Sequence, residues 1–560
     1  MSVKHKPVPE SIRNLSTLRD LLDYSAAEYD TRIALATRNG ESLTYAHVGT
    51  MVARAREFLA AKGVNPGDRV ALLGENRPEW GIAYLAVTSM GAVAVPILTD
   101  FSSETIAVIL EHAGVSGTLV SQSLESKVPA ETASRFVYDI EELTRNAREQ
   151  DAEGVRAHHS PTESLPAETD LAAILYTSGT TGEPKGVMLS HGNIVADVIA
   201  SRSVVEIGPE DRFLSVLPLA HSYECTVGFL VPFVSGASIT YLGGPPTISA
   251  LLPALGAVRP TMMLTVPLIM EKIYGARVKP LFRKNRLTRL LRRVPPARKL
   301  VHRIAGGKIY EAFGGALRFY GIGGAPLTPD TERFLREARF PYSIGYGLTE
   351  TSPLIAGTDA QHTKFRSTGP PIAGVEVRID REAGDGVEGE VLVRGPNVMQ
   401  GYYRNEEATA AVFTQDGWLR TGDIASVDRQ GYLFLRGRLK NLILGPGGEN
   451  IYPDDVENAI NEHELVVESL VFEWKGQLAA RVHVDIEALK ARLGAHAAHV
   501  PAVQERADEL LEELRRTVNA RVSRHARVAR MVLEWEPFEK TPTRKIKRFL
   551  YTHLREHEAG

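Results

Sequence analysis

The chain has 560 residues, which is too long for a single hydrophobic core, so we expect at least two domains. Hydrophobic residues make up 43% of the chain and charged residues 24%, as in ordinary globular proteins, and the net charge of -3 argues against nucleic acid as the main partner. The single cysteine, Cys225, excludes an internal disulfide bond and fits a reducing cytosol. A lone cysteine is more often a small apolar filler than a catalytic thiol.

The N-terminal part has the pattern of an α/β protein. Its first residues lack the apolar core of a signal peptide, which favours a cytoplasmic location. Residues 15–60 predict two amphipathic helices around a turn. The strand Arg69–Leu73, a helix through Trp80–Met90 and the strand Ala92–Pro96 form a βαβ unit, which implies a parallel sheet. The polar, acidic residues 121–168 predict surface loops.

A glycine-rich loop follows the apolar strand Leu171–Thr177. The loop, Ser178–Gly186, contains three glycines, three hydroxyl side chains and Lys185 in nine residues. Glycines let backbone N–H groups converge on one point, hydroxyls add donors and lysine adds positive charge, so the loop suits a polyphosphate. The alternative is a solvated hairpin. A Walker loop is excluded because it requires Ser or Thr after the lysine, where this chain has Gly186.

The next stretch predicts buried structure without a membrane span. Ser190 or Asn193 can cap a helix through Ile194–Ala200. The uncharged tract Cys225–Val258 is long enough to suggest a span, but its prolines and glycines break it into shorter pieces. We therefore expect a buried helix, a strand at Ser238–Leu242 and a turn there.

Residues 277–308 hold twelve Lys and Arg residues and no Asp or Glu. Since the whole chain has a net charge of -3, the rest of it is acidic. Leu287, Leu290, Leu291 and Val294 fall at helical spacing among these bases. Two interpretations stay open: a solvated basic helix, or a helix that contacts an anionic membrane surface.

Two glycine turns follow expected strands in the second half. The strand Leu317–Tyr320 runs into Gly321–Pro326 (GIGGAP), and the strand Phe340–Ile344 runs into Gly345–Glu350 (GYGLTE). α/β proteins bind ligands at such strand ends. Residues 372–436 alternate apolar and polar positions between many glycines, which predicts short antiparallel strands and hairpins.

Four stretches occur in an order that resembles one known family. The loop Tyr176–Val187 (YTSGTTGEPKGV) resembles, almost letter for letter, the phosphate loop of the adenylate-forming enzymes: acyl-CoA synthetases, luciferases and adenylation domains. GYGLTE, TGD at Thr421–Asp423 and FEKTPTRKIKR at Phe538–Arg548 match further motifs of that family. The resemblance runs from about Leu15 to Arg548. It is strongest with long-chain fatty acyl-CoA synthetases.

In the family the corresponding residues bind ATP and Mg²⁺. The Gly-Gly-Ala-Pro turn backs the adenine, an aromatic residue stacks on it, and the TGD carboxylate binds both ribose hydroxyls. The threonine of the second motif contacts the α-phosphate, and its glutamate, here Glu350, holds Mg²⁺, since hard cations prefer carboxylate oxygen. The resemblance therefore implies ATP contacts by Thr177, Ser178, Gly179, Thr180, Thr181, Gly182, Lys185, Gly324, Ala325, Pro326, Tyr346, Gly347, Thr349, Asp423 and Arg438.

The resemblance also implies a moving domain and a CoA channel. Lys440 matches the hinge, and Lys545 matches the lysine that swings over the α-phosphate, so with Thr349 they form the expected catalytic set. Thr543-Arg544 replaces the commoner Ser-Gly before Lys545, and Lys547 leaves the register open. His221 in LPLAHSYE lines the acyl tunnel by this match, with a hydrogen-bonded core histidine as the alternative. The pantetheine channel is assigned to Gly448, Glu449 and Asn450.

The expected fold is α/β: a large N-terminal domain of α/β subdomains with a β-rich part (1–437), a hinge (438–440) and a small α+β domain (441–560). The expected function is an AMP-forming acid:CoA ligase that uses ATP, Mg²⁺ and coenzyme A to activate a medium- or long-chain fatty acid. Alternatives are an acyl-AMP ligase that serves a carrier protein, an aryl-CoA ligase and a non-catalytic binding protein. The expected location is the cytoplasm, with membrane contact through 277–308 left open.

Overall fold

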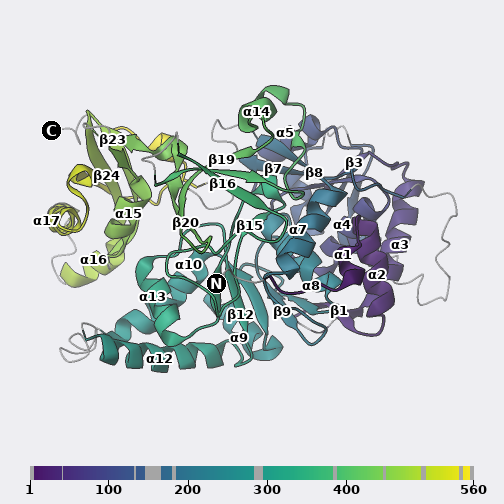
Figure 1. Cartoon of the computed structure of the whole chain (residues 1–560), viewed down its shortest axis with the longest axis horizontal. Helices are drawn as coiled ribbons and strands as arrows, with labels where there is room; N and C mark the ends of the chain where they lie inside the picture. The colour runs from purple at the N-terminus through teal and green to yellow at the C-terminus, as the bar shows by residue number, and fades with distance from the viewer. Residues whose placement is uncertain are drawn as a thin grey trace.

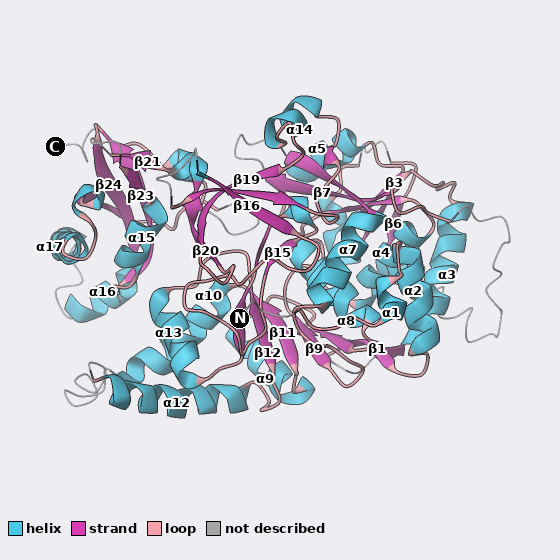
Figure 2. Ribbon diagram, viewed as in Figure 1, coloured by secondary structure: helices cyan, strands magenta, loops and turns pink. Residues whose placement is uncertain are grey.

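Two seven-stranded sheets with helices between them form the larger part of the molecule (Figure 1). The computed structural model describes residues 5–38, 40, 42–130, 134–145, 165–178, 184–282, 294–381, 387–445, 449–463, 465–493, 500–540 and 546–554. Within these residues, a β-rich part and a small C-terminal α+β part follow the two sheets along the chain (Figure 2). The expected α/β class is confirmed.

The first sheet contains the predicted βαβ unit. Its order is β18-β8-β7-β4-β3-β5-β6, and the pairs from β7 to β6 are parallel. Helix α4 (Pro78–Ser89) connects β3 to β4 as expected. The prediction of surface loops over 121–168 is wrong in part, because β6 extends the sheet and a short helix, η1 (Gln122–Lys127), precedes it. The strands are β3 (Arg69–Leu73), β4 (Val93–Pro96), β5 (Gly117–Val120), β6 (Val137–Asp139), β7 (Leu171–Ser178), β8 (Pro184–Ser190) and β18 (Gly401–Tyr402).

The second sheet has the order β13-β12-β11-β9-β10-β1-β2 and is parallel except for the β1–β2 pair. The expectation of two helices around a turn in residues 15–60 is incomplete, because β1 and β2 lie between those helices. The strands are β1 (Ile33–Thr37), β2 (Ser42–Thr44), β9 (Arg212–Ser215), β10 (Ser238–Tyr241), β11 (Met262–Thr265), β12 (Phe319–Ile322) and β13 (Tyr342–Ile344).

A layer of helices lies between the two sheets and shares one hydrophobic core with both (Figure 1). Helix α4 is apolar nearly all round and buried along its length, as a central helix must be. Ser190 and Asn193 form a reciprocal capping box at the start of α7, so both predicted capping residues contribute. The layer contains α2 (Leu18–Glu28), α4, α7 (His191–Arg202), η2 (Tyr223–Leu230) and α8 (Val231–Val234).

The remaining helices of this part lie around the sheets. Helix α5 packs on the outer face of the first sheet, where it forms a separate apolar cluster. The helices are α1 (Glu10–Arg13), α3 (Tyr45–Ala61), α5 (Ser103–Ala113), α9 (Ile248–Val258), α10 (Pro267–Ile273), α12 (Pro295–Ala312) and α13 (Pro329–Ala338), with the short turns η3 (Tyr274–Val278) and η4 (Lys279–Phe282).

The β-rich part is a four-stranded antiparallel sheet, in the order β16-β17-β19-β20, as the alternation in 372–436 predicts. One segment departs from that pattern, because β18 pairs with β8 in the first sheet and α14 (Glu406–Val412) follows it. The other elements are β14 (Tyr346–Gly347), η5 (Thr349–Thr351), β15 (Leu354–Ala356), β16 (Glu376–Asp380), β17 (Gly389–Arg394), β19 (Leu419–Val427) and β20 (Leu433–Arg438).

The C-terminal part has a core of its own, formed by residues such as Ile451, Ile460 and Leu514. Among the described helices of the whole chain, no helix is both long and apolar enough to cross a membrane. The elements are η7 (Leu439–Asn441), β21 (Ile443–Leu444), β22 (Asn450–Ile451), α15 (Pro453–Asn461), β23 (Val466–Trp474), β24 (Gln477–Val484), α16 (Ile486–Leu493), α17 (Val500–Asn519), η9 (Arg524–Ala526), β25 (Val528–Glu534) and η10 (Arg548–Leu550).

Candidate active site

The predicted phosphate loop joins two antiparallel strands, β7 and β8. Thr177 lies opposite Lys185 and Ser178 lies opposite Pro184 in this hairpin. Four predicted residues of the loop, Gly179, Thr180, Thr181 and Gly182, lie outside the described residues. The hairpin therefore places Thr177 and Lys185 side by side at the base of the loop.

The predicted adenine turn follows β12 directly. Gly324 has φ of 85°, a left-handed backbone conformation that glycine adopts without strain. Gly324, Ala325 and Pro326 are exposed, and α13 begins three residues after Pro326. The turn therefore presents its surface to solvent at the end of a parallel strand, which is where an α/β sheet binds ligands.

Tyr346, Asp423 and Arg438 form one hydrogen-bonded group across the β-rich sheet. The Tyr346 hydroxyl donates to Asp423 Oδ2 at 2.8 Å, and Arg438 Nε lies 2.7 Å from Asp423 Oδ1. Burial, together with the nearby Asp423 carboxylate, raises the pKa of the Tyr346 hydroxyl well above its usual range. Tyr346 therefore stays a neutral donor that holds the carboxylate in place.

Glu350 lies in the short turn η5, directly after β14. Its Oε1 accepts a hydrogen bond from the Tyr402 hydroxyl at 3.0 Å, and its backbone oxygen accepts one from Met399 N at 2.9 Å. The Tyr402 ring also lies beneath Lys185, whose Nζ is 5.2 Å from the ring centroid. Tyr402 thus connects a residue of the phosphate hairpin to the predicted metal ligand.

Gly347 occupies the tightest position of this turn. A Cβ placed there would lie 1.9 Å from the carbonyl oxygen of Pro353, which accepts a hydrogen bond from Leu348 N at 2.9 Å. Only glycine fits this approach of β14 to β15. Thr349, two residues later, begins η5, so its position depends on the same close contact.

His221 is half-buried in the segment between β9 and η2. Its Nδ1 accepts a hydrogen bond from Tyr223 N at 3.2 Å. The same segment is held by Asn76, whose Oδ1 accepts from Leu219 N at 2.8 Å. These contacts fit the hydrogen-bonded histidine of the alternative interpretation and leave the acyl-tunnel assignment a prediction.

Residues of the predicted hinge and CoA channel follow the β-rich sheet. Lys440 is exposed in η7, and Glu449 O accepts a hydrogen bond from Gly445 N at 2.8 Å. Asn450 lines a cleft of about 400 Å³ that also includes Arg366, which belongs to the N-terminal part. Gly448 lies outside the described residues.

The two lysines near the C-terminus differ in what the structure describes. Lys545 lies outside the described residues. Lys547 is hydrogen-bonded to Glu539 twice, through its backbone N at 2.9 Å and through Nζ to Oε2 at 3.3 Å. Lys547 thus has a local partner, and the assignment of Lys545 to the motif stays a prediction.

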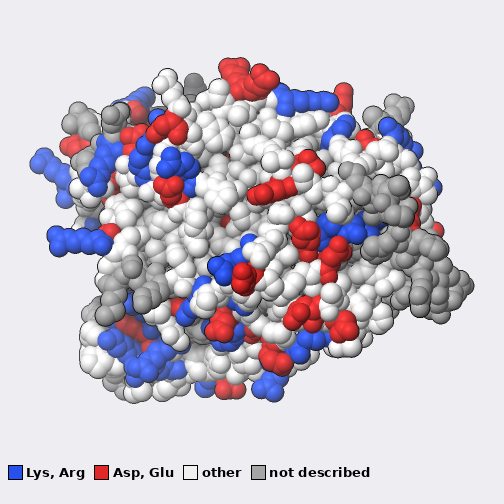
Figure 3. Space-filling view, turned by 45° about the vertical axis from the view of Figure 1, so that its right-hand side comes forward, with Lys and Arg blue, Asp and Glu red and all other residues white. Residues whose placement is uncertain are grey.

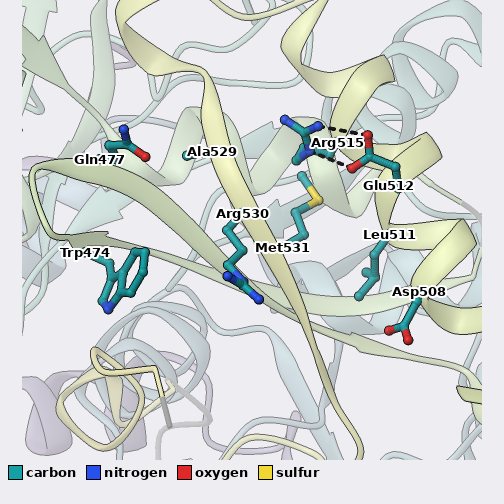
Figure 4. Close-up of a pocket in the computed structure, with 9 residues that line it drawn as sticks. All are labelled: Trp474, Gln477, Asp508, Leu511, Glu512, Arg515, Ala529, Arg530 and Met531. Atoms are coloured by element: carbon teal, nitrogen blue, oxygen red, sulfur yellow. Dashed lines mark hydrogen bonds and ion pairs between the residues drawn. The ribbon is translucent and has the colours of Figure 1, made fainter. Parts of the chain in front are cut away.

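A second hollow, of about 390 Å³, lies between α17 and β25 in the C-terminal part (Figure 4). Arg515 donates to both carboxylate oxygens of Glu512 at 2.8 Å, so these two charges already satisfy each other. None of the predicted site residues that the structure describes lines this hollow. We therefore assign the candidate site to the hairpin and turns described above.

The sequence interpretation missed Tyr402 and Asn397, which both support the Glu350 turn. A signal was present in Gly401-Tyr402-Tyr403, where two aromatic residues follow a glycine within the β-rich stretch. Their partners are distant in sequence, since Tyr402 lies 52 residues from Glu350 and Asn397 lies 200 residues from Asp197. No local pattern identifies such a pair.

Comparison with known proteins identifies the family. The family model of the AMP-binding enzyme matches residues 22–403. The chain is 31% identical over 486 residues to long-chain-fatty-acid–CoA ligase FadD15 of Mycobacterium bovis, covering 80% of this chain and 78% of the relative. It is 32% identical over 434 residues to feruloyl-CoA synthase of an Amycolatopsis species, covering 76% of this chain and 80% of the relative.

A solved structure extends the likeness to nearly the whole chain. O-succinylbenzoate coenzyme A synthetase from Bacillus subtilis, in complex with ATP and magnesium ion, has a TM-score of 0.73 at 27% identity and covers 94% of this chain and 98% of its own. The family match includes the phosphate hairpin, Glu350 and Tyr402. This chain therefore belongs to the AMP-binding enzyme family, the adenylate-forming enzymes that its motifs resemble.

Proposed function

We propose that this chain is an ATP-dependent acid:CoA ligase that activates a medium- or long-chain fatty acid and transfers the acyl group to coenzyme A. One observation carries the proposal: a continuous series of contacts joins Lys185 through Tyr402 to Glu350. Tyr346, four residues before Glu350 in the sequence, donates a hydrogen bond to Asp423. Groups suited to phosphate and metal are thus in contact, and the residue that holds a carboxylate suited to ribose lies close to them along the chain.

The reaction explains why these groups are needed. A carboxylate is a poor acyl donor, so its oxygen first attacks the α-phosphorus of ATP; a phosphorus–oxygen bond forms, and the bond to the leaving pyrophosphate breaks. The CoA thiol then loses its proton, attacks the acyl carbonyl and displaces AMP. Transfer at phosphorus depends mainly on positioning and electrostatic stabilisation. We assign Lys185, Thr349 and Lys545 to those tasks.

The residues present fit a magnesium ion that enters with the nucleotide. Glu350 offers a carboxylate, and no cluster of three or more Asp, Glu, His or Cys side chains suitable for a metal occurs among the described residues. Mg²⁺ typically binds one or two carboxylates together with substrate phosphates and water. When bound, it offsets the charge of the triphosphate.

Two other acceptor and substrate classes must be distinguished from this one. The relative named feruloyl-CoA synthase supports an aryl acid as the alternative substrate, and a carrier protein is the alternative acceptor. ATP–pyrophosphate exchange with acids from C2 to C18 and with aromatic acids tests the substrate class. CoA-dependent AMP release tests the acceptor. Exchange without CoA-dependent AMP release would indicate a carrier protein, and no exchange with any acid would refute the ligase.

We infer that residues 1–437 and 441–560 form two domains joined at 438–440. Their hydrophobic cores support this, since residues from Ile451 onward cluster separately from the sheets of the N-terminal part. Rotation of the C-terminal domain about Lys440 then allows one site to catalyse the two successive reactions. We assign Glu449 and Asn450, which follow the hinge in the sequence, to the channel for the pantetheine arm of CoA.

We also infer that α12 brings the enzyme to anionic membrane surfaces. Leu300 and Ile304 are exposed by 60% and 57% on the same face as Lys299 and Arg303. Arg298, in contrast, is paired with Glu337 at 2.6 Å. An apolar ridge flanked by cations fits the boundary between lipid headgroups and acyl chains.

Helix α12 lies at the lower edge of the molecule in Figure 1. Over the face shown in Figure 3, acidic and basic side chains are interspersed without a broad basic field, which does not favour nucleic acid. The arginines at 289, 292 and 293 lie outside the described residues, so the test uses α12 itself.

Liposome co-sedimentation tests the membrane contact. The double variant Lys299→Glu/Arg303→Glu is expected to lose binding to anionic vesicles, because each basic residue near the surface contributes about 1 kcal/mol. The control Lys62→Glu/Lys475→Glu carries the same change of charge on other exposed elements. Equal binding to neutral and anionic vesicles, or equal loss in both variants, would contradict the contact.

A further inference from the structure

The segment Asn397–Tyr403 lies between the phosphate hairpin and the Glu350 turn. On one side, Tyr403 N donates to Gly186 O at 2.8 Å, and Gln400 N donates to Met188 O at 3.0 Å. On the other side, Met399 N donates to Glu350 O at 2.9 Å. This segment, which we call the strap, is bonded to both walls of the candidate site.

The start of the strap is fixed by a buried polar network. Asn397 is fully buried, and its Nδ2 donates to the backbone oxygens of Thr351 and Leu354, each at 2.8 Å. The buried Asp197 of α7 accepts a hydrogen bond from Leu354 N at 3.0 Å, and Ser352 Oγ donates to Asn397 O at 2.8 Å. The loop after Glu350 is therefore held rigidly by residues outside the predicted motifs.

Tyr402, near the end of the strap, contacts two charged groups at once. The residue is 8% exposed, Lys185 Nζ lies 5.2 Å from its ring centroid, and its hydroxyl donates to Glu350 Oε1 at 3.0 Å. A glutamate side chain has several rotatable bonds, and this hydrogen bond selects one orientation of the carboxylate.

We propose that Tyr402 is a positioning residue that orients Glu350 toward the metal–nucleotide complex while its ring face holds Lys185 over the phosphate hairpin. The inference rests on the proposed function, because it assumes that Glu350 meets MgATP. Partners that orient a metal ligand typically change metal affinity by about 10- to 100-fold when removed. The hydroxyl and the ring have separable tasks, which makes the assignment testable.

The test measures binding rather than turnover, by isothermal titration of the full chain with ATP in the presence of Mg²⁺ or of EDTA. Tyr402→Phe keeps the ring and removes the hydroxyl, so we expect affinity for ATP with Mg²⁺ to fall about tenfold, at the low end of that range, while affinity in EDTA stays within about twofold. Tyr402→Leu removes the ring as well, and affinity should fall under both conditions.

The adjacent Tyr403 supplies a matched control. Its hydroxyl donates to the backbone oxygen of Ala113 at 3.5 Å and not to Glu350, and the Phe variant keeps the ring that Arg404 contacts, so Tyr403→Phe should leave both affinities unchanged. A double-mutant cycle adds a second test, since Tyr402→Phe should have no further effect on affinity in a Glu350→Gln background. This cycle also separates orientation of the carboxylate from a general loss of structure.

Three results of the Tyr402 comparison overturn the assignment. They are an equal loss of affinity with and without Mg²⁺ in Tyr402→Phe, no loss in either condition, and additivity of Tyr402→Phe and Glu350→Gln. If the wild-type chain binds MgATP but forms no AMP with any acid, the proposed ligase function is wrong. The affinities of the Tyr402 variants for MgATP then still test the Tyr402 assignment independently. No ATP binding by the wild type would overturn both.

Discussion

Replacing Gly347 by alanine should displace the turn that carries Thr349 and Glu350. A Cβ at this position would lie 1.9 Å from the Pro353 carbonyl oxygen, and real Cβ atoms essentially never come closer than 3.0 Å to such a neighbour. The contacted atom is backbone, so no side chain can rotate away and the two strands must separate by about 1 Å. A 1 Å misplacement of reacting groups can cost about 10²-fold in rate.

The effect on folding should be much smaller than the effect on catalysis. Separation of the strands breaks the hydrogen bond from Leu348 N to Pro353 O, and one such bond contributes about 1 kcal/mol to the free energy of unfolding. ATP–pyrophosphate exchange measured with saturating acid gives the rate, and thermal denaturation gives the stability. We therefore expect a loss of about 10²-fold in exchange from a protein that is still folded.

Gly345→Ala is the matched control two residues earlier. A Cβ there meets the end of the Leu354 side chain at 3.3 Å, which can shift, and the Ala356 carbonyl oxygen at 3.9 Å, an ordinary contact distance, so exchange should remain close to that of the wild type. Retention of wild-type exchange by Gly347→Ala would refute the reasoning, because it would mean that the turn can widen without moving the groups that act on ATP.

Three further predictions concern the C-terminal part and the helical layer. Lys545→Ala should lower adenylation by at least about 10²-fold and leave thioester formation from supplied acyl-adenylate largely intact. Lys547→Ala should change neither reaction, because Lys547 pairs with Glu539. The reverse pattern in ATP–pyrophosphate exchange would assign the motif to Lys547. Lys440→Pro fixes φ of residue 440 at about −65° and should reduce CoA consumption while pyrophosphate release continues. Equal losses in the two half-reactions would contradict a hinge at this position. Burial lowers the pKa of His191 to about 4, below its value of about 6.5 in the unfolded chain, so the unfolded chain binds a proton between these pH values that the folded chain does not. The stabilising contribution of the neutral His191 ring is therefore fully present above about pH 6.5, and below that pH the free energy of unfolding should fall by up to about 1.4 kcal/mol per pH unit. Denaturation of the wild type and of His191→Gln across this pH range tests the prediction, since the variant should show a flatter dependence on pH.

Much of the local structure could be predicted because its signal lies within a few residues. Alternating apolar positions identified the antiparallel sheet of 372–436, and the βαβ pattern identified β3, α4 and β4 to within two residues. Strands β1, β2 and β6 were among those missed. Unlike β3 and β4, they were not marked by a strand–helix–strand pattern, and their pairing with a neighbouring strand is set by the tertiary structure.

The amino-acid sequence by itself determined the family and named the groups that we propose to meet ATP, because loops of glycine, hydroxyl and charged residues specify their chemistry locally. Lys185, Glu350 and Asp423 could all be named from such motifs. The tertiary structure alone decided how these groups are held, since Tyr402, Asn397 and Asp197 act across long separations in sequence. Hydrogen bonds of this kind depend on distances of about 3 Å between atoms, which only the packing of the two sheets and the strap can set.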